Sequence, residues 1–193
     1  MSSAKKVLSF VTTNMNKLAE VGTMLPDYLV QHVNLDTVEI QGTYREVVVE
    51  KCLQAYRQTK SAVLVEDTSL IFNAFGNLPG PYIKEFYLTL KPAGLYKLLA
   101  GFEDKSAKAV CVFAYLPQNS TPTAEEVQVF EGICPGHIVE PRLGEGVGFG
   151  WDPCFQPEGF TQTFAEMPAS EKHKISHRSR ALQALKNYFE KQQ

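Results

Sequence analysis

The chain has 193 residues, a length that fits one domain or two tightly joined lobes and excludes a linked multidomain assembly. Hydrophobic residues make up 44% of it and aromatic residues 11%, so it can bury a sizeable core and is not globally disordered. Its 19 Lys and Arg residues nearly balance its 21 Asp and Glu residues, for a net charge of -2. This balance disfavours attraction of nucleic acid or of an acidic membrane by the whole molecule.

No apolar stretch approaches the roughly 20 residues that a transmembrane helix needs, and the start has no small-residue cleavage site for secretion. We therefore expect a cytoplasmic protein that does not bind membranes. The four cysteines are widely spaced, at Cys52, Cys111, Cys134 and Cys154. Because no Cys-x-x-Cys pair and no His-Glu-x-x-His motif occurs, the pattern favours reduced, buried thiols over a zinc site or a redox dithiol.

The first third of the chain alternates strand and helix patterns. Residues 7–11 form a β-rich run, and the cap residues 12–14 then lead into a helical pattern that ends near Leu25. Residues 28–35 are predicted to be a second strand. Thr43 and Glu46 form a capping box, which opens a second helix. That helix is expected to bury the apolar residues on one face, namely Val48, Cys52, Ala55 and Tyr56.

Ala62–Val65 is uninterrupted apolar sequence, as in a strand covered on both faces, and is predicted to end at Glu66-Asp67-Thr68. Leu78–Pro81 then predicts a turn. Two helices are expected next, over residues 82–90 and 93–100, with a break at Lys91-Pro92. Strands are expected over residues 109–116 and 127–138, joined as a hairpin, and a last helix over residues 176–190.

Together these patterns predict an α/β fold with a mixed central β-sheet flanked by helices. No repeat or hinge-like linker appears, so residues 1–193 are interpreted as a single domain. The hairpin region 105–150 is the candidate for a second lobe.

Two segments near strand ends have side chains suited to a phosphate and a metal. Thr12, Thr13 and Asn14 precede a helix with Lys17 one turn inside it, so they either cap that helix or bind an anion at its N-terminus. Glu66 and Asp67 follow a predicted central strand, where open α/β sheets bind their ligands. Carboxylate oxygens there suit Mg²⁺ bridging to phosphate better than a turn-capping role.

Two later segments suit the other end of a nucleotide. Phe149-Gly150-Trp151-Asp152-Pro153 contains the only tryptophan, whose ring could belong to the core or stack on a base. Six of the nine residues from Lys172 to Arg180 are basic or histidine, more than an ordinary solvated face carries in a protein of balanced charge. This cluster favours a single nucleotide over a DNA-reading helix.

The inventory of anion donors, carboxylates, aromatic rings and basic side chains describes a site for a nucleoside polyphosphate. Neither a Gly-x-x-x-x-Gly-Lys-Ser/Thr loop nor a Gly-x-Gly-x-x-Gly turn is present, so the common ATPase and dinucleotide folds are not indicated.

These segments, in this order, also carry a resemblance that runs from about Val7 to Phe189. The matching motifs are Thr12-x-Asn14-x-x-Lys17, Val65-Glu66-Asp67-Thr68, residues 78–84, 149–153 and 165–167, and Ser176-His177-Arg178. They resemble the inosine triphosphate pyrophosphatases, which hydrolyse non-standard purine nucleoside triphosphates to the monophosphate and pyrophosphate. The segments 99–107 and 151–157 are especially similar to the eukaryotic members.

The resemblance implies an elongated fold with a cleft between two lobes, Mg²⁺ dependence (with Mn²⁺ as a substitute) and a homodimer. Asp67 would activate water, with Glu66 and Lys17 as the other catalytic residues, and Glu39 and Asp67 would hold the metal. Residues that would bind the substrate are Thr12, Thr13, Asn14, Lys17, Lys51, Thr68, Lys84, Phe149, Gly150, Trp151, Asp152, Lys172, His177 and Arg178. Thr13 departs from the glycine common in the family, and its β-carbon would crowd a phosphate approaching the backbone.

The implied reaction is attack of water on the α-phosphorus of ITP, dITP or XTP, with pyrophosphate as the leaving group. Arg178 or His177 would donate to the O6 acceptor of hypoxanthine or xanthine, whereas adenine presents an amino donor there. Two alternatives stay open from the sequence. One is a pyrophosphatase for modified pyrimidine nucleotides, and the other is a non-catalytic nucleotide- or RNA-binding module that uses residues 172–180.

Overall fold

The structure, a computed structural model, describes residues 6–26, 28–144 and 150–192, which form two compact units. The first unit takes its residues from positions 1–67, 112–131 and 181–193, and the second from 68–111 and 132–180. A seven-stranded sheet has the order β2-β1-β3-β5-β6-β7, with β4 paired to β3. Strands β3 (Val63–Phe72), β5 (Ser106–Leu116) and β6 (Gln128–Ile138) contribute residues to both units. The mixed α/β fold is confirmed.

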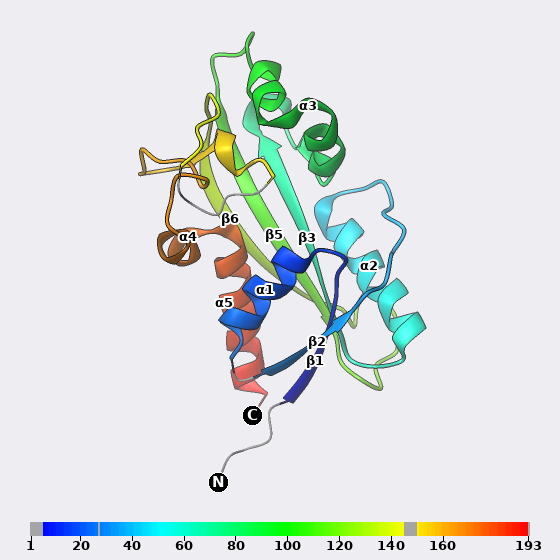
Figure 1. Cartoon of the computed structure of the whole chain (residues 1–193). Coiled ribbons are helices and arrows are strands. Elements are labelled where there is room, and N and C mark those ends of the chain that lie inside the picture. The colour runs from blue at the N-terminus through cyan, green and yellow to red at the C-terminus, as the bar shows by residue number, and fades with distance from the viewer. Residues whose placement is uncertain (1–5, 27, 145–149, 193) are drawn as a thin grey trace. The chain divides into compact units, whose positions relative to one another are not determined.

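The first unit begins with alternating strands and helices (Figure 1). These are β1 (Lys6–Val11), α1 (Met15–Met24), β2 (Tyr28–Val33) and α2 (Tyr44–Thr59), followed by β3. β1 pairs in parallel with β2 on one side and with β3 on the other. Because parallel crossovers are right-handed, the two connections place α1 and α2 on opposite faces of the sheet. The strand order reverses between β1 and β3, which is where open α/β sheets bind ligands.

Helix α2 forms as the sequence predicts. The Thr43 hydroxyl accepts from the Glu46 amide, and the Glu46 carboxylate accepts in return from the Thr43 backbone, so both halves of the capping box are present. The helix buries Val48, Cys52, Ala55 and Tyr56, as expected, together with Val47 and Leu53. It ends at Lys60, which adopts the left-handed conformation with φ 53°.

The predicted end of the third strand was wrong. β3 does not stop at Val65 but runs on to Phe72, so Glu66 and Asp67 lie within a strand. The reason is that the segment after Asp67 is also β-favouring, and Leu70 and Ile71 pair antiparallel with Gly80 and Pro79 of β4 (Pro79–Gly80). The parallel pairing of β3 with β1 nevertheless ends at Val65, so the two carboxylates directly follow that ladder.

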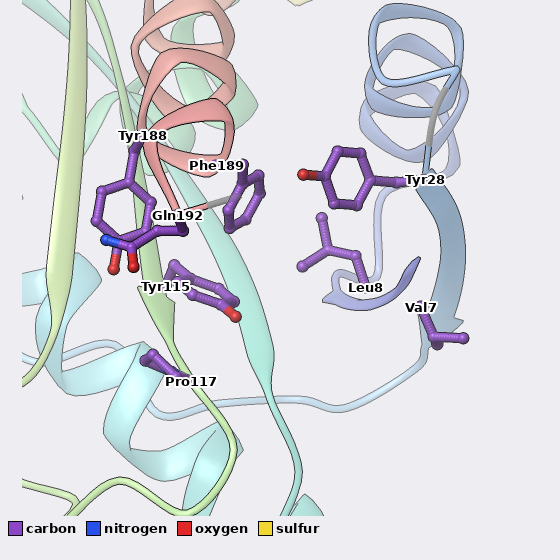
Figure 2. Close-up of a pocket in the computed structure, with 8 residues that line it drawn as sticks. All are labelled: Val7, Leu8, Tyr28, Tyr115, Pro117, Tyr188, Phe189 and Gln192. Carbon is purple, nitrogen blue, oxygen red and sulfur yellow. The ribbon is translucent and has the colours of Figure 1, made fainter. Parts of the chain in front are cut away.

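Within the first unit, an aromatic cluster packs around the end of α5 (His177–Lys191). The ring of Phe189 lies 5.0 Å from the rings of both Tyr28 and Tyr115. These rings, with Tyr188, line an open cavity of about 250 Å³ near the start of β1 (Figure 2). The apolar stripe predicted for the last helix therefore packs, at its end, against Tyr28 of β2 and Tyr115 of β5.

The second unit has its own core. α3 (Ile83–Leu98) carries the predicted break, because Lys91 before Pro92 has φ 58° and ψ 174°. The short elements η1 (Asn73–Phe75), η2 (Asp152–Cys154) and β7 (Phe155–Pro157) complete the unit with α4. α4 (Ala169–Ile175) was not predicted, and it places Lys172 on a separate helix from His177. The core packs strand residues such as Leu70 and Phe72 with Trp151, Phe155 and Phe164.

Among the residues that the structure describes, none of the helices is both long enough and apolar enough to span a bilayer.

Candidate active site

In the first unit, α2, β3 and the connection between β2 and α2 bring one ammonium group to two carboxylates. The Lys51 Nζ atom lies 3.0 Å from Asp67 Oδ1 and 3.0 Å from Glu39 Oε1. The Asp67 side chain is only 10% exposed and that of Lys51 only 15%, whereas Glu39 is 43% exposed. The bridge therefore lies at the boundary between the interior and solvent.

A second ion pair joins α1 to the same strand. Lys17 Nζ lies 3.2 Å from Glu66 Oε1, and the Glu66 side chain is fully buried. Because neighbouring residues of a strand point to opposite faces, Glu66 meets a lysine of α1 while Asp67 meets a lysine of α2. We call the set Lys17, Glu39, Lys51, Glu66 and Asp67 the carboxylate–lysine cluster.

Burial and charge set the protonation of this cluster. Burial raises the pKa of Asp67, and the ammonium groups of Lys51 and Lys17 offset that only in part. Burial would lower the pKa of Lys51, but the charges of Asp67 and Glu39 outweigh it and raise the pKa above its ordinary value. Lys51 is therefore a firmly protonated cation.

The donor set suits a hard divalent cation that shares its coordination with a substrate. Asp67 Oδ2 is buried and accepts no hydrogen bond from any part of the chain that the structure describes, while Oδ1 is bonded to Lys51. Across residues 6–26, 28–144 and 150–192, no group of three or more His, Cys, Asp or Glu side chains could hold a metal ion. Mg²⁺ commonly uses one or two carboxylates plus phosphate oxygens and water, so two acidic ligands fit that mode.

At the start of α1, the structure shows the capping role that the sequence left open. Asn14 Oδ1 accepts from the amides of Asn16 and Lys17, and the Thr12 hydroxyl accepts from the Asn14 amide. Thr13 is exposed at the same turn. These bonds satisfy two amides of the first helical turn internally. An anion at this position would find the Lys17 ammonium one turn inside the helix.

In the second unit, a buried ion pair and three rings gather around η2 and the start of α5. Lys172 Nζ lies 2.6 Å from Asp152 Oδ2, with both side chains almost fully buried. The His177 ring lies 5.5 Å from the Trp151 ring and 6.0 Å from that of Phe164. We call these residues, Trp151, Asp152, Phe164, Lys172 and His177, the aromatic–ionic cluster.

The structure thus brings together most of the residues expected at each end of a nucleotide, within separate units. Trp151 is only 8% exposed and belongs to the core of the second unit, which favours the core role over an open stacking platform. Arg178 is buried, Thr68 is partly buried, Lys84 is exposed at the start of α3, and Gly150 has φ 64°. Phe149 lies outside the described residues.

Sequence reasoning missed the hydrogen-bond network around Arg142. Arg142 donates to Glu166 Oε2 at 3.0 Å, to the Gln156 side chain at 2.8 Å and to the Thr161 carbonyl at 2.8 Å. Its amide also donates to the Pro153 carbonyl. The sequence does show Arg142 directly after Pro141 and ahead of a glycine-rich segment, which could have drawn attention to it. It could not identify the partner, because Glu166 lies 24 residues away.

The aromatic cavity of the first unit does not compete with these clusters as a triphosphate site. The described residues of its lining, shown in Figure 2, are rings, aliphatic groups, Pro117 and Gln192, and none of them is charged. It also lies at the start of β1, whereas Lys17 follows the end of that strand. A polyanion needs cationic partners, so the carboxylate–lysine cluster is the candidate.

Comparison with known proteins matches this chain to one family over nearly its whole length. The model of the Ham1 family covers residues 8–188. Among solved structures, a HAM1 protein from Coxiella burnetii is 26% identical with a TM-score of 0.84, over 96% of this chain and 99% of that one. The Ham1 protein of Staphylococcus aureus is 24% identical with a TM-score of 0.78, over 97% and 100%, and shares the fold.

A third structure has a stated activity. It is a nucleoside-triphosphatase, or dITP/XTP pyrophosphatase, from Mycobacterium abscessus. That protein is 26% identical to this chain with a TM-score of 0.72, over 93% of this chain and 98% of its own.

Proposed function

This chain therefore belongs to the Ham1 family, and we propose that it hydrolyses non-standard purine nucleoside triphosphates to the monophosphate and pyrophosphate. The coarser activity, hydrolysis of nucleoside triphosphates, rests on the family and on the Mycobacterium abscessus relative. The finer part of the proposal names ITP, dITP and XTP as substrates, with Mg²⁺ as the cofactor and Mn²⁺ as its substitute.

The observation that carries the proposal is the carboxylate–lysine cluster. Lys17 and Lys51 are each within 3.2 Å of a carboxylate on β3, next to the point where the strand order reverses. A triphosphate needs cationic side chains, and its metal needs carboxylate oxygens, in the same place. Glu39 and Asp67 would hold Mg²⁺, which when bound neutralises charge on the phosphate oxygens.

Asp67 is the proposed catalytic base. Its Oδ2 atom is buried, and its pKa is raised by burial, which makes it a better proton acceptor than an ordinary carboxylate. It would orient a water for attack on the α-phosphorus, while Lys17 and Lys51 neutralise the negative charge that grows on the leaving pyrophosphate. Glu66 holds Lys17 in place. Thr12, Thr13, Asn14, Thr68 and Lys84 are the proposed further contacts to the substrate.

We assign the base of the nucleotide to the aromatic–ionic cluster, with Phe149, Gly150 and Arg178. Trp151 would support this site from the core of the second unit. His177 and Arg178 would donate to the O6 oxygen of hypoxanthine or xanthine. Adenine would leave such donors unpaired, at about 1–3 kcal/mol each, because it has an amino group at that position. Asp152 and Lys172, a buried pair bonded at 2.6 Å, would help to surround the edge of the base.

The remaining parts of the proposal rest on the sequence. Segments 99–107 and 151–157 support a eukaryotic-type member, although the three solved relatives are from bacteria. We also propose a cytoplasmic homodimer that binds neither nucleic acid nor membranes.

The test is a product analysis over a panel of ITP, dITP, XTP, ATP, GTP and pyrimidine triphosphates, with Mg²⁺, with Mn²⁺ and with EDTA. We expect IMP and pyrophosphate from ITP in stoichiometric amounts, loss of turnover in EDTA, and a kcat/KM for ITP at least about tenfold above that for ATP. Diphosphate and orthophosphate as products would overturn the proposed bond cleavage. Faster hydrolysis of the pyrimidine triphosphates would overturn the assignment of the base.

A further inference from the structure

The two carboxylates proposed to hold the metal already share a cation in the protein alone. Lys51 Nζ lies at hydrogen-bond distance, 3.0 Å, from both Glu39 Oε1 and Asp67 Oδ1. Lys51 comes from α2, Asp67 from β3 and Glu39 from the connection that precedes α2. The ammonium of Lys51 therefore joins these two side chains.

A divalent cation cannot join the same carboxylates without opposing Lys51. Mg²⁺ lies about 2.0–2.1 Å from its carboxylate ligands, so it would come within a few ångströms of the ammonium. Like charges at that distance, in a partly buried place, repel strongly. Metal binding therefore requires Lys51 to move away, or is weakened for as long as Lys51 stays.

The charge of the cluster points to where Lys51 would go. Three carboxylates and two ammonium groups leave one excess negative charge, which disfavours a free polyanion. A bound divalent cation reverses the sign to one excess positive charge. A triphosphate would then be attracted, and a lysine released from Glu39 and Asp67 would have phosphate oxygens as its new partners.

We propose that Lys51 is a stand-in cation, which holds Glu39 and Asp67 together in the free protein and is transferred to the triphosphate when a divalent metal replaces it. This inference rests on the proposed function of the same site. Its consequence is that metal and triphosphate each favour the binding of the other, because the exchange of Lys51 links the two equilibria.

The first experiment measures Mn²⁺ binding to the nucleotide-free protein, by the electron paramagnetic resonance signal of free Mn²⁺. Lys51→Met removes the competing cation and should bind Mn²⁺ on the order of tenfold more tightly than the wild type. Lys51→Arg keeps the charge and should resemble the wild type. So should the control Lys97→Met, which removes an exposed lysine of α3. Lys51→Met binding no tighter than the wild type would overturn the proposal.

A second measurement needs no Lys51→Met protein, in case that variant does not fold. Lysines of the wild type are labelled with ¹³C-methyl groups, and the Lys51 signal is assigned by its loss in Lys51→Arg. Titration with Mg²⁺ alone should shift this signal saturably, because the ammonium leaves its two carboxylates. A Lys51 signal that stays unchanged at saturating Mg²⁺ would also overturn the exchange.

Failure of this inference is distinguishable from failure of the proposed function. If the wild type hydrolyses ITP but Lys51→Met binds Mn²⁺ no more tightly than the wild type, the proposed function stands and the exchange of Lys51 is removed. Tighter Mn²⁺ binding in Lys51→Met, with no hydrolysis of any purine triphosphate by the wild type, would leave the exchange standing and remove the proposed function.

Discussion

Asp67 is the residue on which the proposed reaction most depends, because it is buried, bonded to a lysine through one oxygen and without a hydrogen bond from the described residues on the other. Its Oδ1 atom is bonded to Lys51, whereas Oδ2 has no hydrogen bond from the described residues. Sequence reasoning selected Asp67 from its place after an apolar strand. It did not identify which lysine would face it, because Lys51 is 16 positions away and the contact depends on how α2 packs on the sheet.

Asp67→Asn should reduce kcat for ITP by a factor of about 10² or more, since an amide neither accepts the proton of water nor binds Mg²⁺ as a carboxylate does. The measurement is steady-state kinetics at saturating Mg²⁺, with circular dichroism to establish that the fold is kept. The matched control is Asp104→Asn, at an exposed aspartate bonded to Ser106, and it should retain wild-type kcat. An unchanged kcat in Asp67→Asn would remove this residue from the mechanism.

At the scale of elements, local signals were reliable and signals that depend on distant partners were not. The capping box of α2 involves residues three positions apart, and it was predicted correctly from Thr43 and Glu46. The end of β3 was misplaced because its second half is fixed by pairing with β4, which local sequence does not reveal. α4 was missed for a similar reason, since Lys172 on this short helix is held by Asp152.

The connection made by Arg142 and Glu166 gives a prediction about pH. Hydrogen bonds from the Thr163 backbone and from Arg142 lower the pKa of Glu166 below its ordinary value of 4.5. A carboxyl group with a lowered pKa in the folded state stabilises the protein above its ordinary pKa, and this contribution is lost as pH falls through the lowered value. Glu166→Gln should therefore lower the free energy of unfolding at pH 7.

The measurement is urea denaturation of Glu166→Gln and wild type from pH 7 down to pH 3. The difference in unfolding free energy should shrink as the pH falls below 4.5, because the wild-type carboxyl then also becomes neutral. Glu103→Gln, at an exposed turn position, serves as the control and should match the wild type throughout. A difference between Glu166→Gln and wild type that is constant with pH would assign the effect to packing and not to charge.

For the whole molecule, composition and periodicity were enough to predict the α/β class and the mixed sheet. The division into units was beyond them, because β3, β5 and β6 each contribute to both. The chain therefore passes between the units within these strands and within α5, and not through a linker that composition would mark.

All four cysteines are buried, as the sequence suggested, and this predicts how the native protein reacts with thiol reagents. Burial raises the pKa of Cys52 and Cys154 to about 12 and that of Cys134 to about 11, so the reactive thiolate is scarce at pH 8. Ellman's reagent should therefore react very slowly with the folded protein and release four equivalents after denaturation. Rapid reaction of any thiol without denaturant would contradict the buried placement.

The place of Trp151 has an optical consequence. It is the sole indole of the chain, and it packs in the second unit with its ring 5.5 Å from those of Phe155 and His177. Light at the long-wavelength edge of the protein absorption band is therefore absorbed by Trp151 alone. The wavelength and lifetime of Trp151 fluorescence report on the surroundings of this ring, whereas the first unit contains no tryptophan to absorb at this wavelength.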